Sequence, residues 1–283
     1  GKSVHLEVPP VEFPHSLIRV AVETKSRGDE DKIGTGLQHI HEEDPSFVSK
    51  FDPELHQIIA EGQGELHLTV VFAKLKKKYG VDVELVEPRI PYRETIQSSA
   101  EDQHRHRKQS GGRGQFGDAH LRVEPKPRGE GFEFIDKIVG GAIPGKFVPA
   151  VEKGVVETMA RGILAGYPVV DVQATVFDGS FHPVDSSDMA FKMAGAHAFQ
   201  KAFLEAKPIL LEPIYKVRVI VPETYMGDVM GDLNGRRGRI QGMDPEGNFQ
   251  VIHAEVPLAD LYKYSTALRS MTQGTGDYTM EFS

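Results

Sequence analysis

The chain has 283 residues, a formal net charge of −8 at pH 7, a sequence pI near 5.9 and no cysteine. This length allows roughly two or three domains. The acidic balance excludes a uniformly basic nucleic-acid binder, so any binding to RNA must come from local patches. The missing cysteines exclude disulfides and Cys-ligated zinc or iron–sulfur sites.

No apolar run reaches the roughly 20 residues of a membrane span, so we expect a soluble, cytoplasmic protein. Because the first residue is Gly1, we expect a piece cut from a longer chain.

Residues 17–86 predict an alternation of strands and helices. Residues 17–23 have the pattern of a strand, and 29–43 that of a helix with Ile33, Leu37 and Ile40 at helical spacing. Two strands, 47–51 and 56–61, precede a helix at 64–79 whose basic end suits a helix C-terminus. A strand at 81–86 completes the order βαββαβ, the split βαβ or ferredoxin-like pattern.

The middle segment begins with a basic, glycine-rich stretch at 107–117. Four glycines leave room for close approach, and no acidic residue occurs between positions 103 and 117, so we interpret the stretch as a loop that approaches a phosphate backbone. Strands at 119–123, 132–135 and 169–176 and a helix at 146–164 follow. After a turn at 178–184, Asp185 or Ser186 is the expected N-cap of an apolar helix that runs to Phe203. The segment is predicted to be an α+β domain of its own.

The last seventy residues repeat the order of the first unit. Strands are expected at 214–221, 239–243, 249–256 and 278–282, and helices at 223–234 and 258–272. Two ferredoxin-like units of common topology thus flank the middle domain, and the predicted fold class is α+β.

A nucleotide hydrolase is one reading of the G-x-x-x-x-G-K sequence at 140–146. Phe147 stands where the magnesium-binding hydroxyl of a P-loop belongs, and Pro144 removes a backbone N–H donor. Gly1-Lys2-Ser3 is followed by a proline-rich stretch instead of a helix. We therefore predict no nucleotide pocket and no catalytic residue in this chain.

Two pairs of histidines, His104 with His106 and His39 with His41, have the i, i+2 spacing that would face one side of a strand. Neither has a third ligand nearby in the sequence, so solvated or phosphate-facing imidazoles are favoured and no metal site is predicted. The carboxylates at 42–44 and Glu65 lack an adjacent nucleophile, and helix-end solvation explains them.

Two further segments could contact RNA. His182 lies in a strand-to-helix turn, where a side chain can point outward from a rigid base, although a histidine bound to its own loop is an alternative. Arg236, Arg237 and Arg239 lie beside two glycines, an arrangement suited to bidentate phosphate recognition; a solvated turn is the other interpretation.

From about residue 10 to its end, the chain strongly resembles the C-terminal half of bacterial elongation factor G. The segments that carry the resemblance, in order, are 42–45 (EEDP), 62–68 (GQGELHL), 91–95 (PYRET), 110–117 (SGGRGQFG), 169–171 (VVD), 185–191 (DSSDMAF), 225–228 (YMGD), 231–234 (GDLN), 236–238 (RRG) and 272–274 (TQG).

The resemblance implies a domain plan and a function. Residues 1–14 would be the tail of a preceding β-barrel, 15–90 the third domain, 91–210 the fourth and 211–283 the fifth. The fourth resembles the second domain of ribosomal protein S5. The chain would be the ribosome-binding part of a translational GTPase that promotes GTP-dependent translocation of tRNA and mRNA, acting as a monomer. GTP and Mg²⁺ would bind in the absent N-terminal domain, so this part would not itself be an enzyme.

The resemblance also implies contacts. The fourth domain would reach the decoding region of the small ribosomal subunit, with two tip loops against the tRNA–mRNA duplex, and the fifth would lie near large-subunit rRNA. The tip-loop residues would be Gly111, Gly112, Arg113, Gly114 and Gln115, with Gln115 at the apex, and Ser180 and His182. The rRNA-contacting residues would be Arg236, Arg237 and Arg239.

Three departures from the family pattern leave the physiological role open. The stretch 104–108 (HRHRK) is unusually basic, Thr275 stands where the family has arginine, and Gly235 replaces alanine. These departures fit an elongation-factor-G-like paralogue, acting in ribosome recycling or stress, at least as well as the main factor.

Overall fold

A computed structural model describes residue 13 and residues 16–26, 28–108 and 114–283. The predicted barrel tail therefore lies outside the described residues except for Phe13. The described chain falls into two compact units, one made of the residues up to Ile90 together with Pro213–Ser283, the other of Pro91–Glu212. None of the helices described is both long enough and apolar enough to cross a membrane.

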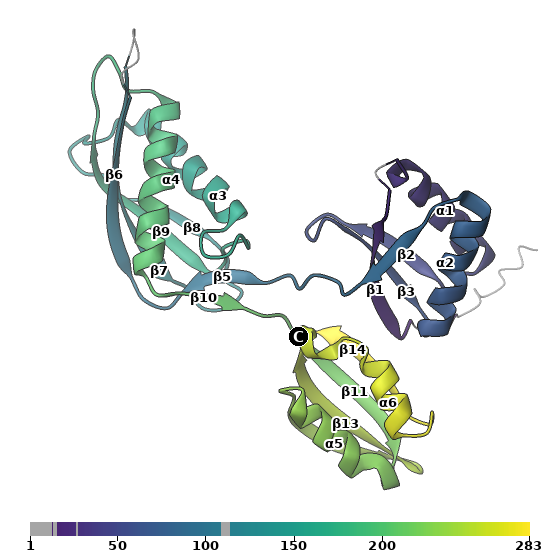
Figure 1. Cartoon of the computed structure of the whole chain (residues 1–283). Helices are drawn as coiled ribbons and strands as arrows, with labels where there is room; N and C mark the ends of the chain where they lie inside the picture. Colours follow the sequence, from purple (N-terminus) through teal and green to yellow (C-terminus); the bar gives the residue numbers. More distant parts are fainter. Residues whose placement is uncertain (1–12, 14–15, 27, 109–113) are drawn as a thin grey trace, which may run out of the picture. The chain divides into compact units, whose positions relative to one another are not determined.

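The first sheet confirms the predicted βαββαβ order. The elements are β1 (Ile18–Thr24), α1 (Glu30–Glu43), β2 (Val48–Asp52), β3 (Gln57–Gly62), α2 (Glu65–Tyr79) and β4 (Val83–Val86). The strands lie in the order β2-β3-β1-β4, and every pair is antiparallel. Helices α1 and α2 cover one face (Figure 1), where Val20, Val22, Ile33 and Leu37 are buried with the apolar side of α2. The core is formed by the alternating residues of the strands and the i, i+4 residues of the helices.

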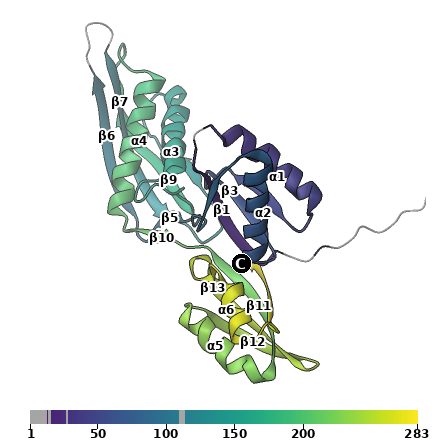
Figure 2. The ribbon, with the colours of Figure 1, turned by 45° about the vertical axis from the view of Figure 1, so that its right-hand side comes forward.

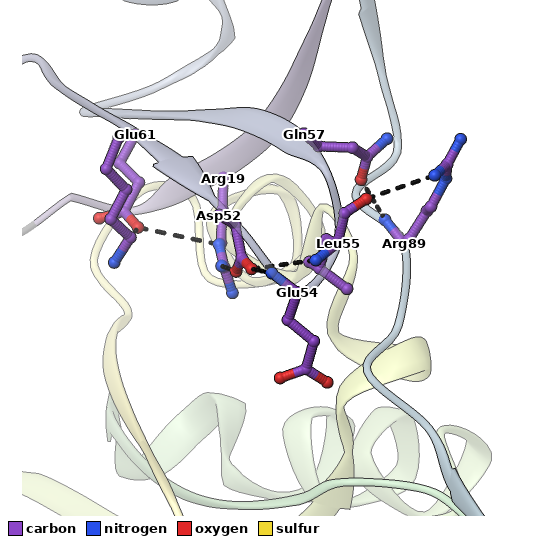
Figure 3. A network of polar contacts seen from close by, with 8 residues as sticks. Arg19, Asp52, Glu54, Leu55, Gln57, Glu61 and Arg89 are labelled. Atoms are coloured by element: carbon purple, nitrogen blue, oxygen red, sulfur yellow. Dashed lines mark hydrogen bonds and ion pairs between the residues drawn. The ribbon is translucent and has the colours of Figure 1, made fainter. Parts of the chain in front are cut away.

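The opposite face of this sheet carries a small second cluster, made of Ala21, Leu55, Ile59 and the partly buried Val86. A polar network lies beside Leu55 of this cluster (Figure 3). Arg89 donates from its backbone to Oε1 of Gln57 at 2.9 Å and from its guanidinium to the carbonyl of Leu55 at 3.3 Å. Arg19 on β1 lies 3.9 Å from Asp52 and 3.8 Å from Glu61. The contacts of Arg89 fix the segment after β4 against the sheet.

The middle unit is an α+β domain, as predicted. Its elements are β5 (Arg93–Ile96), β6 (Ala100–Lys108), β7 (Gln115–Pro125), β8 (Glu133–Asp136), α3 (Val148–Arg161), β9 (Val172–Ser180), α4 (Asp188–Glu205) and β10 (Pro208–Leu211). The main sheet has the order β6-β7-β9-β8, with β8 parallel to β9, and β5 pairs with β10 in a separate ribbon. Helix α4 runs along β6 and β7 (Figure 2). Phe191, Phe199 and Phe203 of α4 pack on Leu121 and Val176 of the sheet.

Close contact between α3 and α4 depends on two glycines. A Cβ on Gly154 would lie 2.1 Å from the carbonyl oxygen of Lys192, and one on Gly195 would lie 2.7 Å from that of Val151. Because these contacts involve backbone atoms, a larger side chain would force the helices apart. The two helices therefore form one tightly packed layer over the sheet.

Three predictions for this domain were wrong in detail. Residues 100–108 form the long strand β6, whereas a loop was expected from 107 onward. The strand carries polar residues on both faces, so it lacks the apolar alternation that marks a strand. The predicted helix 146–164 is shorter, because Gly145–Phe147 form a 3₁₀ turn and Gly162 has a φ of 75°. Ser187, not Asp185 or Ser186, is the N-cap of α4, accepting from the N–H of Ala190.

The last sheet has the same topology as the first. It contains β11 (Ile214–Pro222), α5 (Met226–Gly235), β12 (Arg239–Glu246), β13 (Phe249–Pro257), α6 (Tyr264–Met271) and β14 (Asp277–Phe282), with 3₁₀ turns at Glu223–Tyr225 and Leu258–Leu261, and the strand order β12-β13-β11-β14. The predicted helix 258–272 is interrupted, because Lys263 adopts a left-handed conformation with a φ of 55°. Both ferredoxin-like units of the predicted fold class are thus present.

Glu94 fixes the base of the middle domain. Its side chain is fully buried and accepts four backbone hydrogen bonds of 2.7–3.0 Å, from Ile163, Leu164, Ala165 and Tyr167. Burial alone would raise the pKa of this carboxyl, but the four N–H donors together outweigh burial and hold its pKa below the ordinary value of 4.5. The charged form therefore holds the 163–167 loop against β5.

Replacing Glu94 with Gln should destabilise this domain by about 3 kcal/mol, since charge-assisted hydrogen bonds are lost and an amide N–H group faces N–H donors. Because the folded pKa is depressed, the contribution of Glu94 is present above the pKa of the unfolded chain and is lost as the pH falls through the folded pKa. Hydrogen exchange of the α3 amides measures the opening free energy. The matched control, exposed Glu130→Gln, should change it little; equal effects of the two variants would contradict this role.

Candidate nucleic-acid interface

One end of the middle domain brings together two segments that are far apart in the sequence. The hairpin of β6 and β7 ends there, and so does the turn between β9 and α4. Asp185 in that turn connects them: its Oδ1 accepts from the N–H of Gly114 at 3.1 Å, and its carbonyl accepts from the N–H of Phe116 at 2.9 Å. We call the described residues 114–116 and 180–186 the tip. The structure therefore brings the described part of the glycine-rich stretch and the second predicted loop together.

Gly117 lies just behind the tip, where β7 crosses the first turn of α4. A Cβ on this residue would lie 2.7 Å from the backbone carbon of Ala190 and 2.9 Å from the nitrogen of Phe191. Real Cβ atoms do not come so close to backbone atoms, so the approach of strand to helix requires glycine here. Part of the glycine-rich motif thus serves packing.

His182 is held in one orientation by its own turn. Its Nδ1 accepts from the N–H of Asp185 at 3.1 Å and of Val184 at 3.3 Å, while its backbone N–H donates to Oγ of Ser186 at 2.9 Å. Oδ2 of Asp185 also lies 3.3 Å from Nδ1. Because two N–H groups donate to Nδ1 from comparable distances, we assign it as an acceptor and the ring proton to Nε2. The side chain is 51% exposed, which leaves Nε2–H available to an acceptor outside the chain. The alternative of a histidine bound to its own turn is confirmed, and contact of its outer edge with a partner stays a prediction.

Gln115 and Ser180 have more internal roles than predicted. Gln115 is the first residue of β7, paired with Lys108, so it lies at the base of the hairpin end and not at its apex; its Oε1 is 3.1 Å from Nε2 of His106. Ser180 donates to Oδ2 of Asp118 at 2.8 Å. Gly111, Gly112 and Arg113 lie outside the described residues. The structure thus gives Ser180 a supporting position and leaves Gln115 and His182 beside the end of the hairpin.

Asp118 is a tip-supporting residue that was not predicted from the sequence. Only 2% of it is exposed, and its Oδ2 accepts from Ser180 and from Nε and a terminal nitrogen of Arg105, at 3.2 and 3.0 Å. The three residues lie side by side on β6, β7 and β9. Its Oδ1 is buried without a described hydrogen-bond partner. Only the alternation of Asp118 with Ala119 in β7 could have signalled a carboxylate facing away from the helices.

The surface of the tip is also apolar. Phe181 and Val184 are 44% and 59% exposed, and the ring of Phe116 lies 6.3 Å from that of His182. Met189, at the adjoining start of α4, is 55% exposed. Exposed apolar side chains around a fixed hydrogen-bond donor suit a partner with both flat and polar surfaces, as unpaired or groove-exposed nucleotides have.

The three arginines of the last sheet have unequal roles. Arg236 donates from Nε to Asp232 and from a terminal nitrogen to the carbonyl of Asp260, each at 2.7 Å, and lies over the ring of Tyr264 at 5.0 Å. Arg237 pairs with the carboxylate of Asp260 at 2.7 Å. Arg239 is exposed, and no described residue pairs with its side chain. Of the predicted rRNA contacts, Arg239 is thus the one whose guanidinium is available.

The other candidate residues have structural partners. His39 stacks on Tyr79, and Nδ1 of His41 lies 2.6 Å from the carbonyl oxygen of Phe47, so the pair does not converge. His67 binds Asp44 at 2.9 Å and joins the end of α1 to the first turn of α2. Lys146 lies 4.8 Å from the ring of Phe147, in a 3₁₀ turn and not in a phosphate-binding loop. Among the residues described, no three histidine, aspartate or glutamate side chains form a metal-binding group.

Comparison with known proteins identifies relatives along the whole described chain. Three family models match: "Elongation Factor G, domain III" over residues 13–87, "Elongation factor G, domain IV" over 88–207 and "Elongation factor G C-terminus" over 209–283. A crystal structure of a protein from Thermus thermophilus is similar, with 45% sequence identity and a TM-score of 0.85. The alignment covers 100% of this chain and 43% of that one, so the chain spans less than half the length of this relative.

Gly117→Ala should destabilise the middle domain by about 2–3 kcal/mol, because β7 must move away from α4. The opening free energy from hydrogen exchange of α4 amides measures the effect. Gly145→Ala is the matched control in the same domain, since no atom lies within 4 Å of an added Cβ there. A neutral Gly117→Ala would show that strand and helix do not approach as closely as described.

Arg236→Ala should lower the opening free energy of the last sheet by about 2 kcal/mol, because it removes an ion pair, a carbonyl hydrogen bond and a contact with Tyr264. Arg239→Ala, which removes no described contact, should change stability by less than about 0.5 kcal/mol. Hydrogen exchange of the β13 amides distinguishes the two. The division of roles would be refuted by a larger effect at Arg239 than at Arg236.

Proposed function

Because the chain belongs to the elongation factor G family, we propose that it is the ribosome-binding C-terminal part of a translational GTPase and that the longer protein promotes translocation of tRNA and mRNA. The single observation that carries this proposal is the tip, where Asp185 joins the glycine-rich hairpin end to the turn that presents His182. The tip acts by shape and hydrogen bonding and not by covalent catalysis.

The partner of the tip is the tRNA–mRNA duplex in the decoding region of the small subunit. An A-form duplex exposes 2′-hydroxyls and phosphates across its minor groove, and these groups accept hydrogen bonds. The Nε2–H of His182 is such a donor, and its ring cannot turn without losing the two N–H groups that bind Nδ1. Gln115, at the base of the hairpin end, adds an amide within the same site. A donor held in place can block backward slippage of the duplex with little ordering cost.

The last sheet contacts large-subunit rRNA through Arg239. Its guanidinium is available for bidentate binding of phosphate, while the internal pairs of Arg236 and Arg237 shape the turn that presents it. GTP and Mg²⁺ would bind in a part of the longer protein that precedes this chain, and hydrolysis there would give the movement its direction. The chain itself contributes no catalytic residue in this proposal, and its place of action is the cytoplasmic ribosome.

A paralogue that acts in ribosome recycling or stress is the second candidate. The observation that favours it is the basic stretch His104–Lys108, which the structure places on β6 beside the tip. Such a protein would bind the ribosome and hydrolyse GTP without moving tRNA. A subunit-splitting assay run beside a translocation assay separates the two candidates.

In the longer protein, His182→Ala should slow translocation about tenfold, since losing one well-placed hydrogen bond costs about 1.4 kcal/mol, while ribosome-stimulated GTP hydrolysis stays near normal. Gln115→Ala should have an effect in the same direction. The measurement follows one round of tRNA movement on programmed ribosomes with GTP. His39→Ala, an exposed histidine in another domain, is the control. Lost hydrolysis with normal translocation would refute the assignment of the tip.

A further inference from the structure

Two histidines lie in the seam between β6 and α4. The rings of His104, from β6, and His197, from α4, have centroids 4.7 Å apart and planes inclined by 48°. His104 and His106 share the helix-facing side of β6, opposite Ala119 and Gly117. Both members of the pair are half-buried. The strand is the edge of its sheet, so the seam opens to solvent along the flank of the domain.

Positive charge dominates around this pair. Lys201, one turn after His197, donates to the carbonyl of Gln103 at 3.2 Å and lies 3.7 Å from Asp102. Burial, followed by the charges of His197, Lys201 and His106, lowers the pKa of His104, and only Asp118, already engaged by Arg105, opposes them. No described residue forms a hydrogen bond or ion pair with either ring of the pair. No described carboxylate therefore pairs directly with either ring, and the neighbouring charges that disfavour protonation of His104 outweigh Asp118.

The acidic residues of β6 do not neutralise the positive charge around the two histidines. Glu101 binds Arg122 and Asp102 is near Lys201, whereas Arg107 and Lys108 have no described acidic partner. The end of β6 beside the tip is therefore electropositive. An anionic polymer complements such a row of positive charges. A divalent metal ion would be repelled by the same charges.

We propose that the seam of His104 and His197 is a second RNA contact; this proposal rests on the proposed function. The seam binds a backbone phosphate and takes up a proton when it does so. The phosphate supplies a counter-charge, and Lys201 of α4 and Lys108, on the same side of β6 as His104, hold the same strand of RNA on either side. Gln115 and His182 would then read the groove, while the seam fixes the angle of the domain on the RNA.

The sign of the proton linkage follows from the counter-charge. A phosphate beside an imidazole raises its pKa, so the extra affinity is fully present below the pKa of the free protein and is lost as the pH rises through the pKa of the complex. The free pKa of His104 lies below its ordinary value of 6.5, and the complex moves it upward. RNA binding should therefore tighten as the pH falls from neutral into the mildly acidic range.

The experiment uses the full chain and a fluorescein-labelled RNA hairpin of about 16 base pairs, the length that small double-stranded RNA modules span. Fluorescence anisotropy gives the dissociation constant between about pH 5.5 and 8 at fixed ionic strength, with EDTA present. Binding of the wild-type chain should tighten about tenfold across this range, and the double variant His104→Gln, His197→Gln should lose most of that change while keeping its affinity near pH 8. His39→Gln should keep the full pH dependence.

A second readout does not depend on variants. The ring-proton NMR signals of His104 should titrate at higher pH with RNA than without it. The inference is overturned by an unchanged pH slope in the double variant or by unshifted titrations. Two results together would refute the seam and leave the tip standing. RNA affinity would fall in His182→Ala at every pH, and the double variant His104→Gln, His197→Gln would keep the pH dependence of the wild-type chain. Absence of RNA binding at any pH would count against both.

Discussion

The arrangement of the tip depends on one residue, Asp185, which connects two segments separated by about seventy positions. Its side chain and carbonyl accept from Gly114 and Phe116, and its N–H donates to His182. A glycine-rich strand end has high conformational entropy, and ordering it against a partner would reduce affinity. The hydrogen bonds of Asp185 order this strand end when the domain folds. The described part of the tip is therefore already ordered before RNA binds. Gly117 behind it and Asp118 beside it hold the hairpin on the body of the domain.

Much of the fold could be predicted from apolar periodicity. In the two ferredoxin-like units, strands with alternating apolar residues and helices with residues such as Ile33, Leu37 and Ile40 produced the correct order of elements. Prediction was wrong where periodicity was absent: β6 is polar on both faces, since its helix-facing side carries Asp102, His104 and His106 at an open edge. It was also wrong where backbone conformation interrupts a regular pattern, as at Lys263, whose left-handed φ ends what would otherwise be one helix.

The candidate site was only partly predictable, because the sequence shows residue types but not partners. His182 could be placed in an exposed turn from its neighbours, yet the tautomer that points its donor outward is set by two backbone N–H groups. Three neighbouring arginines looked equivalent in the sequence, whereas Asp232, Asp260 and Tyr264 engage two of them and leave Arg239 available. The rings of His104 and His197 are in contact although the residues are 93 positions apart. No local pattern in the sequence predicts such a contact.

These local arrangements matter more here because the whole chain is acidic. With a net charge of −8, the protein has little long-range attraction for RNA, and at physiological salt charges are screened beyond about 8 Å. Recognition must then come from a few groups placed at contact distance, on a body that does not deform. Internal carboxylates provide that rigidity: Glu94 fixes the base, Asp118 the sheet and Asp185 the tip of the middle domain. The negative charge that weakens general RNA binding is thus partly the charge that positions the specific contacts.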